Sequence, residues 1–269
     1  MRTAVIVTTY NRPDALAAVL DGYAAQDGHD FELIVADDGS TGDTRRLIEE
    51  RARSTPFALR HVWQEDHGFR AAAIRNRALA ATRADYVIFP DGDCVPAREF
   101  VARHRRLAER GRFLAGNRVA LSAGLTERVL RERLPIHAWS GWQWVRAWLT
   151  GKVNRLWPLL ILPDGGFRKW RPRRWRGART CNLSAWRSDL LAVNGLDETF
   201  AGWGLEDSDL VIRLLHAGIK HKSARFATPM FHLWHREADR GRLAENQRLL
   251  DDLIASRRIR APLGVDQYL

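Results

Sequence analysis

The sequence predicts an α/β fold: a mostly parallel central sheet with helices on both of its faces. Short apolar runs of strand length alternate with helical segments, which is the order of βαβ units. These runs are rich in Val, Ile, Phe and Tyr, as expected of strands in the interior of a sheet. With 269 residues, the chain is long enough to bury a full core.

The expected elements follow one another at short spacing. Residues 3–9 read as the first strand, and Pro13 then fits the first position of a helix whose apolar residues recur at helical spacing. Further strands are expected at 31–36, 58–63, 86–89, 113–121, 180–186 and 224–228. Further helices are expected at 44–51, 70–79, 100–110, 189–193, from 206 to Gly218, and at 243–254.

Two carboxylates follow the strand at 86–89 directly. Asp91 and Asp93 are separated by Gly92, which allows a sharp turn and lets both carboxylates face one point. Ligands bind at the carboxyl end of strands in open α/β sheets. Close carboxylates repel unless a cation lies between them, so a divalent ion with substrate phosphates is one interpretation. A solvated Asp-Gly-Asp turn is the other.

The same edge of the sheet is expected to carry more polar groups. Asp37 and Asp38 end the strand at 31–36, and Thr8 ends the first strand. Carboxylates and hydroxyls would therefore gather at one edge of a basic protein. A helix N-cap is an equally good explanation of Asp37 and Asp38 taken alone.

The C-terminal part carries a second acidic group. Glu206 and Asp207 fall in the first turn of a helix, where acids also interact favourably with the helix dipole. Trp203 lies between Gly202 and Gly204, which would let its ring move or approach a ligand.

Cysteine and histidine are sparse. Cys94 and Cys181 make neither a disulfide framework nor a metal-ligand pattern, so a cytoplasmic location is expected. His232 and His235 are spaced i, i+3, and either could be an ordinary surface or core histidine. The chain starts a strand almost at once, which indicates no signal peptide.

The net charge of +11 predicts anionic partners: nucleotide phosphates, nucleic acid or an anionic membrane surface. Eight of the eleven tryptophans lie between Trp139 and Trp186, and eight Lys or Arg but no acid lie between Gly165 and Ser188. This mixture suits a membrane interface. It would also suit stacking on single-stranded nucleic acid, or a packed loop that covers an acceptor.

Four motifs together resemble an inverting family 2 glycosyltransferase of the GT-A fold with a galactosyltransferase-like C-terminal region. They are Val5–Pro13, Val35–Thr41, Asp91–Asp93 and Gly202–Asp209. The resemblance implies a Rossmann-like, mostly parallel sheet in a single domain with a C-terminal acceptor-binding part. It further implies three parts: a nucleotide-sugar-binding half, a Trp/Arg-rich insertion facing membrane or acceptor, and an acceptor and catalytic half. These parts are residues 1–122, 123–176 and 177–269.

The resemblance also implies roles for single residues. Those expected to bind the donor are Thr8, Tyr10, Asp37, Asp38, Arg70 and Asp91. Those expected to hold Mn²⁺ or Mg²⁺ are Asp93 with Asp91 and either His232 or His235. Asp207 is expected to be the general base, with Glu206 beside it. Those expected to meet the acceptor are Trp203, Gly204 and Asp209, whereas Ser208 stands where the galactosyltransferases resembled have another acid.

The function implied is metal-dependent, inverting transfer of one sugar from a nucleotide-diphosphate sugar, expected to be UDP-linked, to a glycan or glycolipid hydroxyl. Bacterial lipopolysaccharide or another surface polysaccharide is the expected product, made peripherally at the inner face of the plasma membrane. The Gln-x-x-Arg-Trp signature of processive synthases is absent, which favours transfer of a single sugar. The alternatives are a non-catalytic nucleic-acid-binding module and a nucleotidyltransferase on a similar fold.

Overall fold

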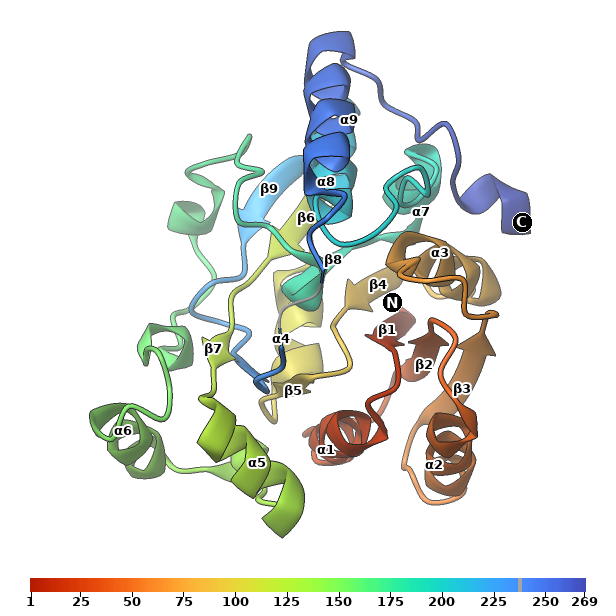
Figure 1. The fold of residues 1–269 in the computed structure, drawn as a ribbon. Helices are drawn as coiled ribbons and strands as arrows, with labels where there is room; N and C mark the ends of the chain where they lie inside the picture. The colour runs from red at the N-terminus through yellow and green to blue at the C-terminus, as the bar shows by residue number, and fades with distance from the viewer. Residues whose placement is uncertain (237–238) are drawn as a thin grey trace.

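A seven-stranded sheet forms the centre of the computed structural model, which describes residues 1–236 and 239–269 (Figure 1). Its strand order is β3-β2-β1-β4-β8-β6-β9. The strands are β1 (Thr3–Thr9), β2 (Glu32–Asp37), β3 (Ala58–Trp63), β4 (Tyr86–Phe89), β6 (Arg112–Ala115), β8 (Leu183–Trp186) and β9 (Lys220–Ser223). A second sheet has the order β5-β10-β7, with β5 (Cys94–Pro96), β7 (Val119–Ala120) and β10 (Met230–His232).

The large sheet is mostly parallel, as predicted. β1 pairs in parallel with both β2 and β4, and β3 is parallel to β2. β8 is antiparallel to both of its neighbours, β4 and β6, while β9 is parallel to β6. The carboxyl ends of β1, β2, β4, β6 and β9 therefore all lie at one edge of the sheet.

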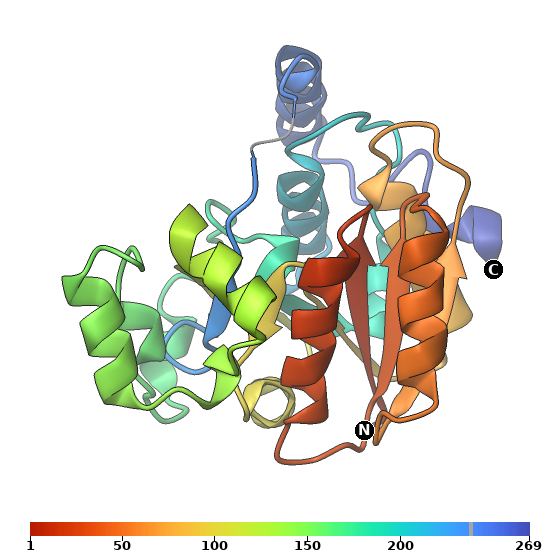
Figure 2. The same ribbon diagram turned by 60° about the horizontal axis from the view of Figure 1, so that its bottom comes forward.

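Helices cover both faces of this sheet. The helices in the described part of the chain are α1 (Pro13–Ala24), α2 (Gly42–Ala52), α3 (Ala71–Ala81), α4 (Phe100–Leu107), α5 (Ala123–Glu132), α6 (Gly141–Leu149), α7 (Arg187–Ala192), α8 (Glu206–His216) and α9 (Leu243–Ser256). Short 3₁₀ turns occupy Ile136–Ala138, Trp157–Leu159, Gly166–Lys169, Thr180–Asn182 and Val265–Tyr268. Figure 2 shows α1 and α2 together on one face. No helix in the described part of the chain has both the length and the apolar character to span a bilayer.

The core is divided between the two faces by the alternation of side chains along each strand. Val5 and Val7 of β1 pack with α1, α2 and α4, whereas Ile6 packs with α3, α7 and α8. Burial on both faces explains why these strands are continuous apolar runs. The predicted fold class is confirmed.

Some expected elements differ. The strand expected at 224–228 is wrong, because these residues form a turn in which Phe226 has a φ of +60°. The edge strand is β9 instead, and its polar sequence Lys-His-Lys-Ser lacks the apolar pattern that marks a strand. The strand expected at 113–121 is divided into β6 and β7.

Candidate active site

The turn after β4 places Asp91 directly beside the end of β1. Thr8 and Asp91 form a parallel β-bridge, and the Gly92 amide donates to the Thr8 carbonyl oxygen at 2.7 Å. A Cβ atom at Gly92 would lie 2.8 Å from that same oxygen, so the close approach requires glycine. The Asp91 side chain remains 30% exposed at this edge.

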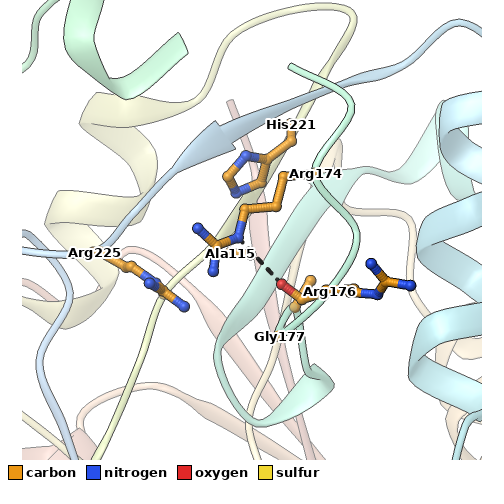
Figure 3. A pocket seen from close by; sticks show the side chains of 8 residues that line it. Ala115, Arg174, Arg176, Gly177, His221 and Arg225 are labelled. Carbon is orange, nitrogen blue, oxygen red and sulfur yellow. Dashed lines mark hydrogen bonds between the residues drawn. The ribbon is translucent and has the colours of Figure 1, made fainter. Parts of the chain in front are cut away.

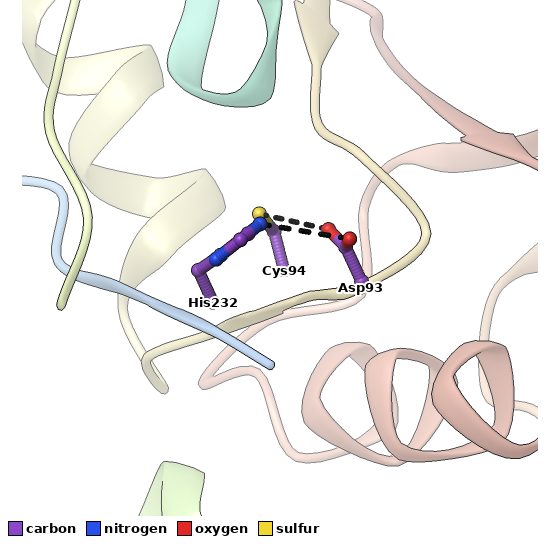
Figure 4. Close-up of side chains that lie close together, drawn as sticks. All are labelled: Asp93, Cys94 and His232. Atoms are coloured by element: carbon purple, nitrogen blue, oxygen red, sulfur yellow. Dashed lines mark hydrogen bonds and ion pairs between the residues drawn. The ribbon is translucent and has the colours of Figure 1, made fainter. Parts of the chain in front are cut away.

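Asp93 lies among histidines from the C-terminal part. Its Oδ2 atom is 3.2 Å from Nε2 of His235 and 3.6 Å from Nε2 of His232. Ligand atoms of Asp93, Cys94 and His232 all lie within 4.8 Å of one another (Figure 4). The pairing of β10 with β5, in which His232 opposes Cys94, brings these distant residues together. We call Asp93, His232 and His235 the metal group.

The chemistry of this group suits a divalent cation. Burial and the charge of Asp91 raise the pKa of Asp93 to about 6, so a nearby cation would stabilise its ionised form. Burial and the charges of Arg118, His235 and Arg179 lower the pKa of His232 to about 3, which keeps its imidazole neutral. Burial raises the pKa of the Cys94 thiol, so Cys94 stays protonated and is the weaker ligand.

A buried arginine connects the two acidic regions. Arg75 of α3 donates from Nε to Thr8 Oγ1 at 2.9 Å and from Nη2 to Asp91 Oδ1 at 3.0 Å. Its Nη1 lies 3.4 Å from Glu206 Oε1 and 4.0 Å from Asp207 Oδ1. Only 5% of the Arg75 side chain is exposed. One guanidinium thus joins the ends of β1 and β4 to the start of α8, and we call these five residues the Arg75 network.

Asp207 is the more accessible carboxylate at the start of α8. Its side chain is 21% exposed, against 10% for Glu206. Its Oδ1 accepts a hydrogen bond from Thr180 Oγ1 at 2.6 Å. This oxygen is held in position, while part of the carboxylate still faces solvent.

Both of these carboxyl groups hold protons more tightly than usual. Burial, followed by the charge of Asp207, raises the pKa of Glu206 to about 7. Burial raises the pKa of Asp207, although Arg75 and Thr180 oppose the change. The charge of Asp91 contributes to both pKa shifts, because all three carboxylates lie around the Arg75 guanidinium.

Four of the predicted donor residues lie at the ends of β1 and β2: Thr8, Tyr10, Asp37 and Asp38. Asp38 is 3% exposed and accepts from the Arg70 amide at 2.8 Å and from Gln64 at 2.5 Å. Asp37 is fully buried and accepts from the Ser40 amide at 2.8 Å. Its other oxygen pairs with His61.

Tyr10 and Arg70 are the accessible members of the donor set. Tyr10 is 48% exposed and donates to Asp66 at 2.8 Å. The Arg70 side chain donates to the Glu65 carbonyl oxygen at 2.5 Å. Asp37 therefore shapes this edge from within, whereas Tyr10 and Arg70 line it.

The loop before α8 is strained. Gly202, Gly204 and also Leu205 have left-handed backbones, with φ values of +72°, +110° and +76°. Leu205 pays a steric cost in this region, and such strain is common at functional sites. The loop presents Trp203, whose ring lies 5.0 Å from the Arg240 guanidinium carbon.

Asp209 is not brought to this surface. It is fully buried and forms an ion pair with Arg213, with its Oδ2 atom 2.5 Å from Nη2. Acceptor contact by Asp209 is therefore not supported. Asp209 and Arg213 are spaced i, i+4, so both side chains lie on the same buried face of α8.

Sequence reasoning missed Arg75, Thr180 and Arg118. Arg75 left a signal, because it stands on the apolar stripe of α3 with Ala71, Ala78 and Leu79. A buried arginine needs acidic partners, which would have pointed to the strand-end carboxylates. Thr180 and Arg118 left none. The charge of Arg118 lowers the pKa of both Asp93 and His232.

Comparison with known proteins identifies the family. A family model described as "Glycosyl transferase family 2" matches residues 4–168. A second model, described as "N-terminal domain of galactosyltransferase", matches residues 165–236. The chain belongs to the family 2 glycosyltransferases. This decides against the nucleic-acid-binding module and the nucleotidyltransferase.

Curated relatives agree with this assignment. Validoxylamine A glucosyltransferase of Streptomyces hygroscopicus subsp. jinggangensis is 30% identical over 225 residues, which cover 80% of this chain and 52% of that protein. Hyaluronan synthase of Pasteurella multocida is 39% identical over 94 residues, covering 35% of this chain and 10% of that protein. The chain thus spans about half or less of the length of these relatives.

Solved structures share the fold. S. aureus TarS has a TM-score of 0.64 at 16% identity and covers 100% of this chain, which corresponds to 41% of TarS. The mannosyltransferase PcManGT of Pyrobaculum calidifontis, solved with GDP-Man and Mn²⁺, has a TM-score of 0.62 at 20% identity and covers 97% of this chain and 66% of that chain. The GT-A fold predicted from the sequence is confirmed.

Replacing Arg75 by methionine should destabilise the protein by about 3–5 kcal/mol at pH 8, because three buried or half-buried carboxylates lose their shared cation. The loss should be smaller at pH 5, since protonation removes the uncompensated charges. Urea unfolding at both pH values measures this. Arg77→Met is the matched control, because Arg77 is exposed on the same helix. Equal effects of the two substitutions would contradict the role of the Arg75 network.

Proposed function

We propose that the protein is a metal-dependent, inverting glycosyltransferase that moves one sugar from a UDP-linked donor to a hydroxyl of a bacterial surface glycan or glycolipid. The observation that carries the proposal is the Arg75 network. It connects Asp91, two residues before Asp93 of the metal group, to the partly exposed carboxylate of Asp207. A donor site and a candidate base thus lie at one sheet edge.

The donor would lie across the ends of β1, β2 and β4. Thr8, Tyr10, Asp38 and Arg70 would bind the nucleoside and Asp91 the ribose or sugar. This assignment is supported by the carboxyl-end position of these residues in an α/β sheet. Relatives of the same fold were solved with UDP, with UDP-GlcNAc and with GDP-Man, and these support a nucleotide-sugar donor.

The metal group would hold Mn²⁺ rather than Mg²⁺. Mg²⁺ prefers oxygen ligands, and this group adds imidazole nitrogens to one carboxylate. When bound, such an ion acts as a Lewis acid that stabilises charge on a leaving diphosphate. Asp93 and the neutral His232 would supply the ligand atoms, and His235 would complete the set.

Asp207 would act as the general base. An acceptor hydroxyl donates its proton to this carboxylate as its oxygen attacks the anomeric carbon from the face opposite the nucleotide. A single displacement inverts the configuration and needs no enzyme nucleophile. Thr180 fixes the orientation of the carboxylate, and Trp203 would lie against the acceptor sugar.

Removal of the metal group should weaken nucleotide binding. In Asp93→Asn and His232→Ala, the affinity for UDP in the presence of Mn²⁺ should fall about 10–100-fold, and EDTA should do the same to the wild type. Calorimetric titration of UDP measures this. His67→Ala is the control, since His67 is exposed and its ion pair is with Glu65. Unchanged affinity in Asp93→Asn would refute the metal assignment.

Asp207→Asn should lower the rate of transfer about 10²–10⁴-fold while UDP binding stays within a few-fold of the wild type. Release of UDP from the donor, with water or glycan as acceptor, measures the rate. Asp251→Asn, at an exposed acid of α9, should have no effect. Wild-type turnover of Asp207→Asn would show that another group is the base.

The pH profile gives a second readout of the same residue. A base must be ionised, so kcat/KM should rise with pH through the pKa of Asp207. Because burial raises this pKa, the rise should lie above the ordinary aspartate range near ~3.9.

Residues 123–176 would form the membrane-facing or acceptor-facing part. Large apolar side chains are exposed there, including Trp142 at 72%, Trp157 at 68% and Trp170 at 79%. Exposed tryptophans among arginines suit the headgroup layer of an anionic bilayer. We propose that this part rests on the inner face of the plasma membrane, where lipid-linked acceptors are available.

Trp157→Ala combined with Trp170→Ala should lower binding to phosphatidylglycerol vesicles at least about fivefold, because each indole removes apolar area from water at the interface. Cosedimentation measures this, with phosphatidylcholine vesicles as the uncharged comparison. Trp63→Ala, at an exposed tryptophan of β3, is the control. A wild type that does not sediment with either vesicle would rule out this surface.

A further inference from the structure

A small basic cavity opens at the ends of β6 and β9. Its enclosed part measures about 10 Å³, which is room for about one water molecule, so a larger anion would bind at its opening. Its lining includes Gly116, Arg174, Gly177, His221 and Arg225. Figure 3 shows the guanidinium groups of Arg174 and Arg225 directed into the same space. A Cβ atom at Gly177 would be in ordinary contact with Arg225 Nη2, at 3.6 Å, so this guanidinium lies against the Gly177 backbone.

The two arginines have no acidic partner in the part of the chain that the structure describes. Arg174 donates from Nε to the Arg176 carbonyl oxygen at 3.2 Å, and the Arg225 side chain makes no hydrogen bond there. The neighbouring cations are different, because Lys222 and Lys169 both pair with Glu109. Glu109 is therefore already engaged in ion pairs with these lysines.

This arrangement is electrostatically unfavourable without an anion. Burial and the charges of Arg174 and Arg155 lower the pKa of Arg225. Burial lowers the pKa of His221 to about 4, and the backbone hydrogen bond to Arg171 only partly opposes this, so the arginines carry the positive charge at neutral pH. Paired guanidinium groups are suited to bidentate contacts with phosphate oxygens.

The cavity adjoins the candidate active site without being part of the metal group. Ala178 lines the cavity and is two residues from Thr180, which limits their Cα separation to about 7 Å. Thr180 holds Asp207. β6 and β9 lie two and three strands from β4, or about 10–14 Å at the usual spacing. An anion here would therefore lie near Thr180 and Asp207, the proposed base, rather than at the metal group.

We propose that Arg174 and Arg225 bind a phosphate ester carried by the acceptor, close to the hydroxyl that Asp207 deprotonates. This inference rests on the proposed function, which supplies the acceptor. It adds the chemical class of that acceptor: a glycan bearing a phosphate mono- or diester. The phosphate would belong either to the glycan itself or to a lipid headgroup, and the two share the same chemistry at this site.

Inorganic phosphate is the first probe, titrated by calorimetry into protein treated with EDTA so that no metal-bound site contributes. The wild type should bind it, and Arg174→Gln and Arg225→Gln should each weaken binding at least about tenfold, as expected for loss of a charge-assisted hydrogen bond. Arg173→Gln removes the same charge from an exposed residue of the same segment and should leave the affinity unchanged. Equal affinities in all variants, or an equal loss in Arg173→Gln, would overturn the proposal.

Thermal melting separates binding from a structural role. Without phosphate, Arg225→Gln should melt at or above the wild-type temperature, because it removes repulsion between like charges. Phosphate should raise the melting temperature of the wild type and not that of the variant. A variant that melts well below the wild type without phosphate would assign Arg225 to the fold and contradict the proposal.

The source of the phosphate is distinguished with glucose 1-phosphate and with phosphatidylglycerol vesicles. Loss of glucose 1-phosphate binding in Arg174→Gln and Arg225→Gln would assign the site to the glycan, and loss of vesicle binding alone would assign it to a lipid headgroup. If both variants kept wild-type binding of glucose 1-phosphate and of the vesicles, the proposed phosphate site would be refuted. UDP binding with Mn²⁺, which both variants should retain, is measured separately. Its absence from the wild type would refute the proposed function while leaving the phosphate site standing.

Discussion

The buried guanidinium of Arg75 is the constraint on which the rest of the site depends. It touches the ends of two neighbouring strands and the first turn of α8, which starts after a strained Leu205 and without a side-chain cap. Burial alone lowers the pKa of Arg75, but the charges of Asp91, Asp207 and Glu206 outweigh burial and raise it. Each partner is therefore stable in this place only because the others are there, as in other fully connected buried polar networks. The same contacts that fix the start of α8 fix the position of the candidate base relative to the donor edge.

The edge is divided by this arginine into regions of different chemistry. On one side, Asp93 and the histidines form a set of oxygen and nitrogen ligand atoms. On the other, Asp207 is held by Thr180 and kept partly open to solvent. Because Arg75 contacts Asp91 rather than Asp93, it neutralises one carboxylate of the Asp-Gly-Asp turn and leaves the second for a metal. Two nearby aspartates can thus have separate roles, since their surroundings differ.

The fold could be predicted from the sequence to a large extent, because strands buried on both faces are continuous apolar runs and the helices between them are periodic. The acids at strand ends could be predicted for the same reason, since a parallel sheet brings its carboxyl ends to one edge. What escaped prediction depends on contacts distant in sequence. Thr180 is brought to Asp207, and Arg174 to Arg225, by the pairing of β6 with β8 and β9, of which β9 has no apolar pattern. Asp209 is the opposite case. It fits the motif, but it lies on the buried face of α8, where it forms an ion pair with Arg213.

Charge is distributed unevenly over this protein. A chain with a net charge of +11 has a centre in which one arginine faces three carboxylates, so anionic substrates meet a locally acidic site. A diphosphate that approached Asp91 and Asp93 would be repelled by their charges unless a cation compensated them, and this supports the proposed metal dependence. Other arginines lie outside that centre, and Arg174 and Arg225, at the ends of β6 and β9, have no acidic partner among the residues that the structure describes. Cations placed beside an acidic centre rather than inside it can attract a phosphate without neutralising Asp207, the proposed base.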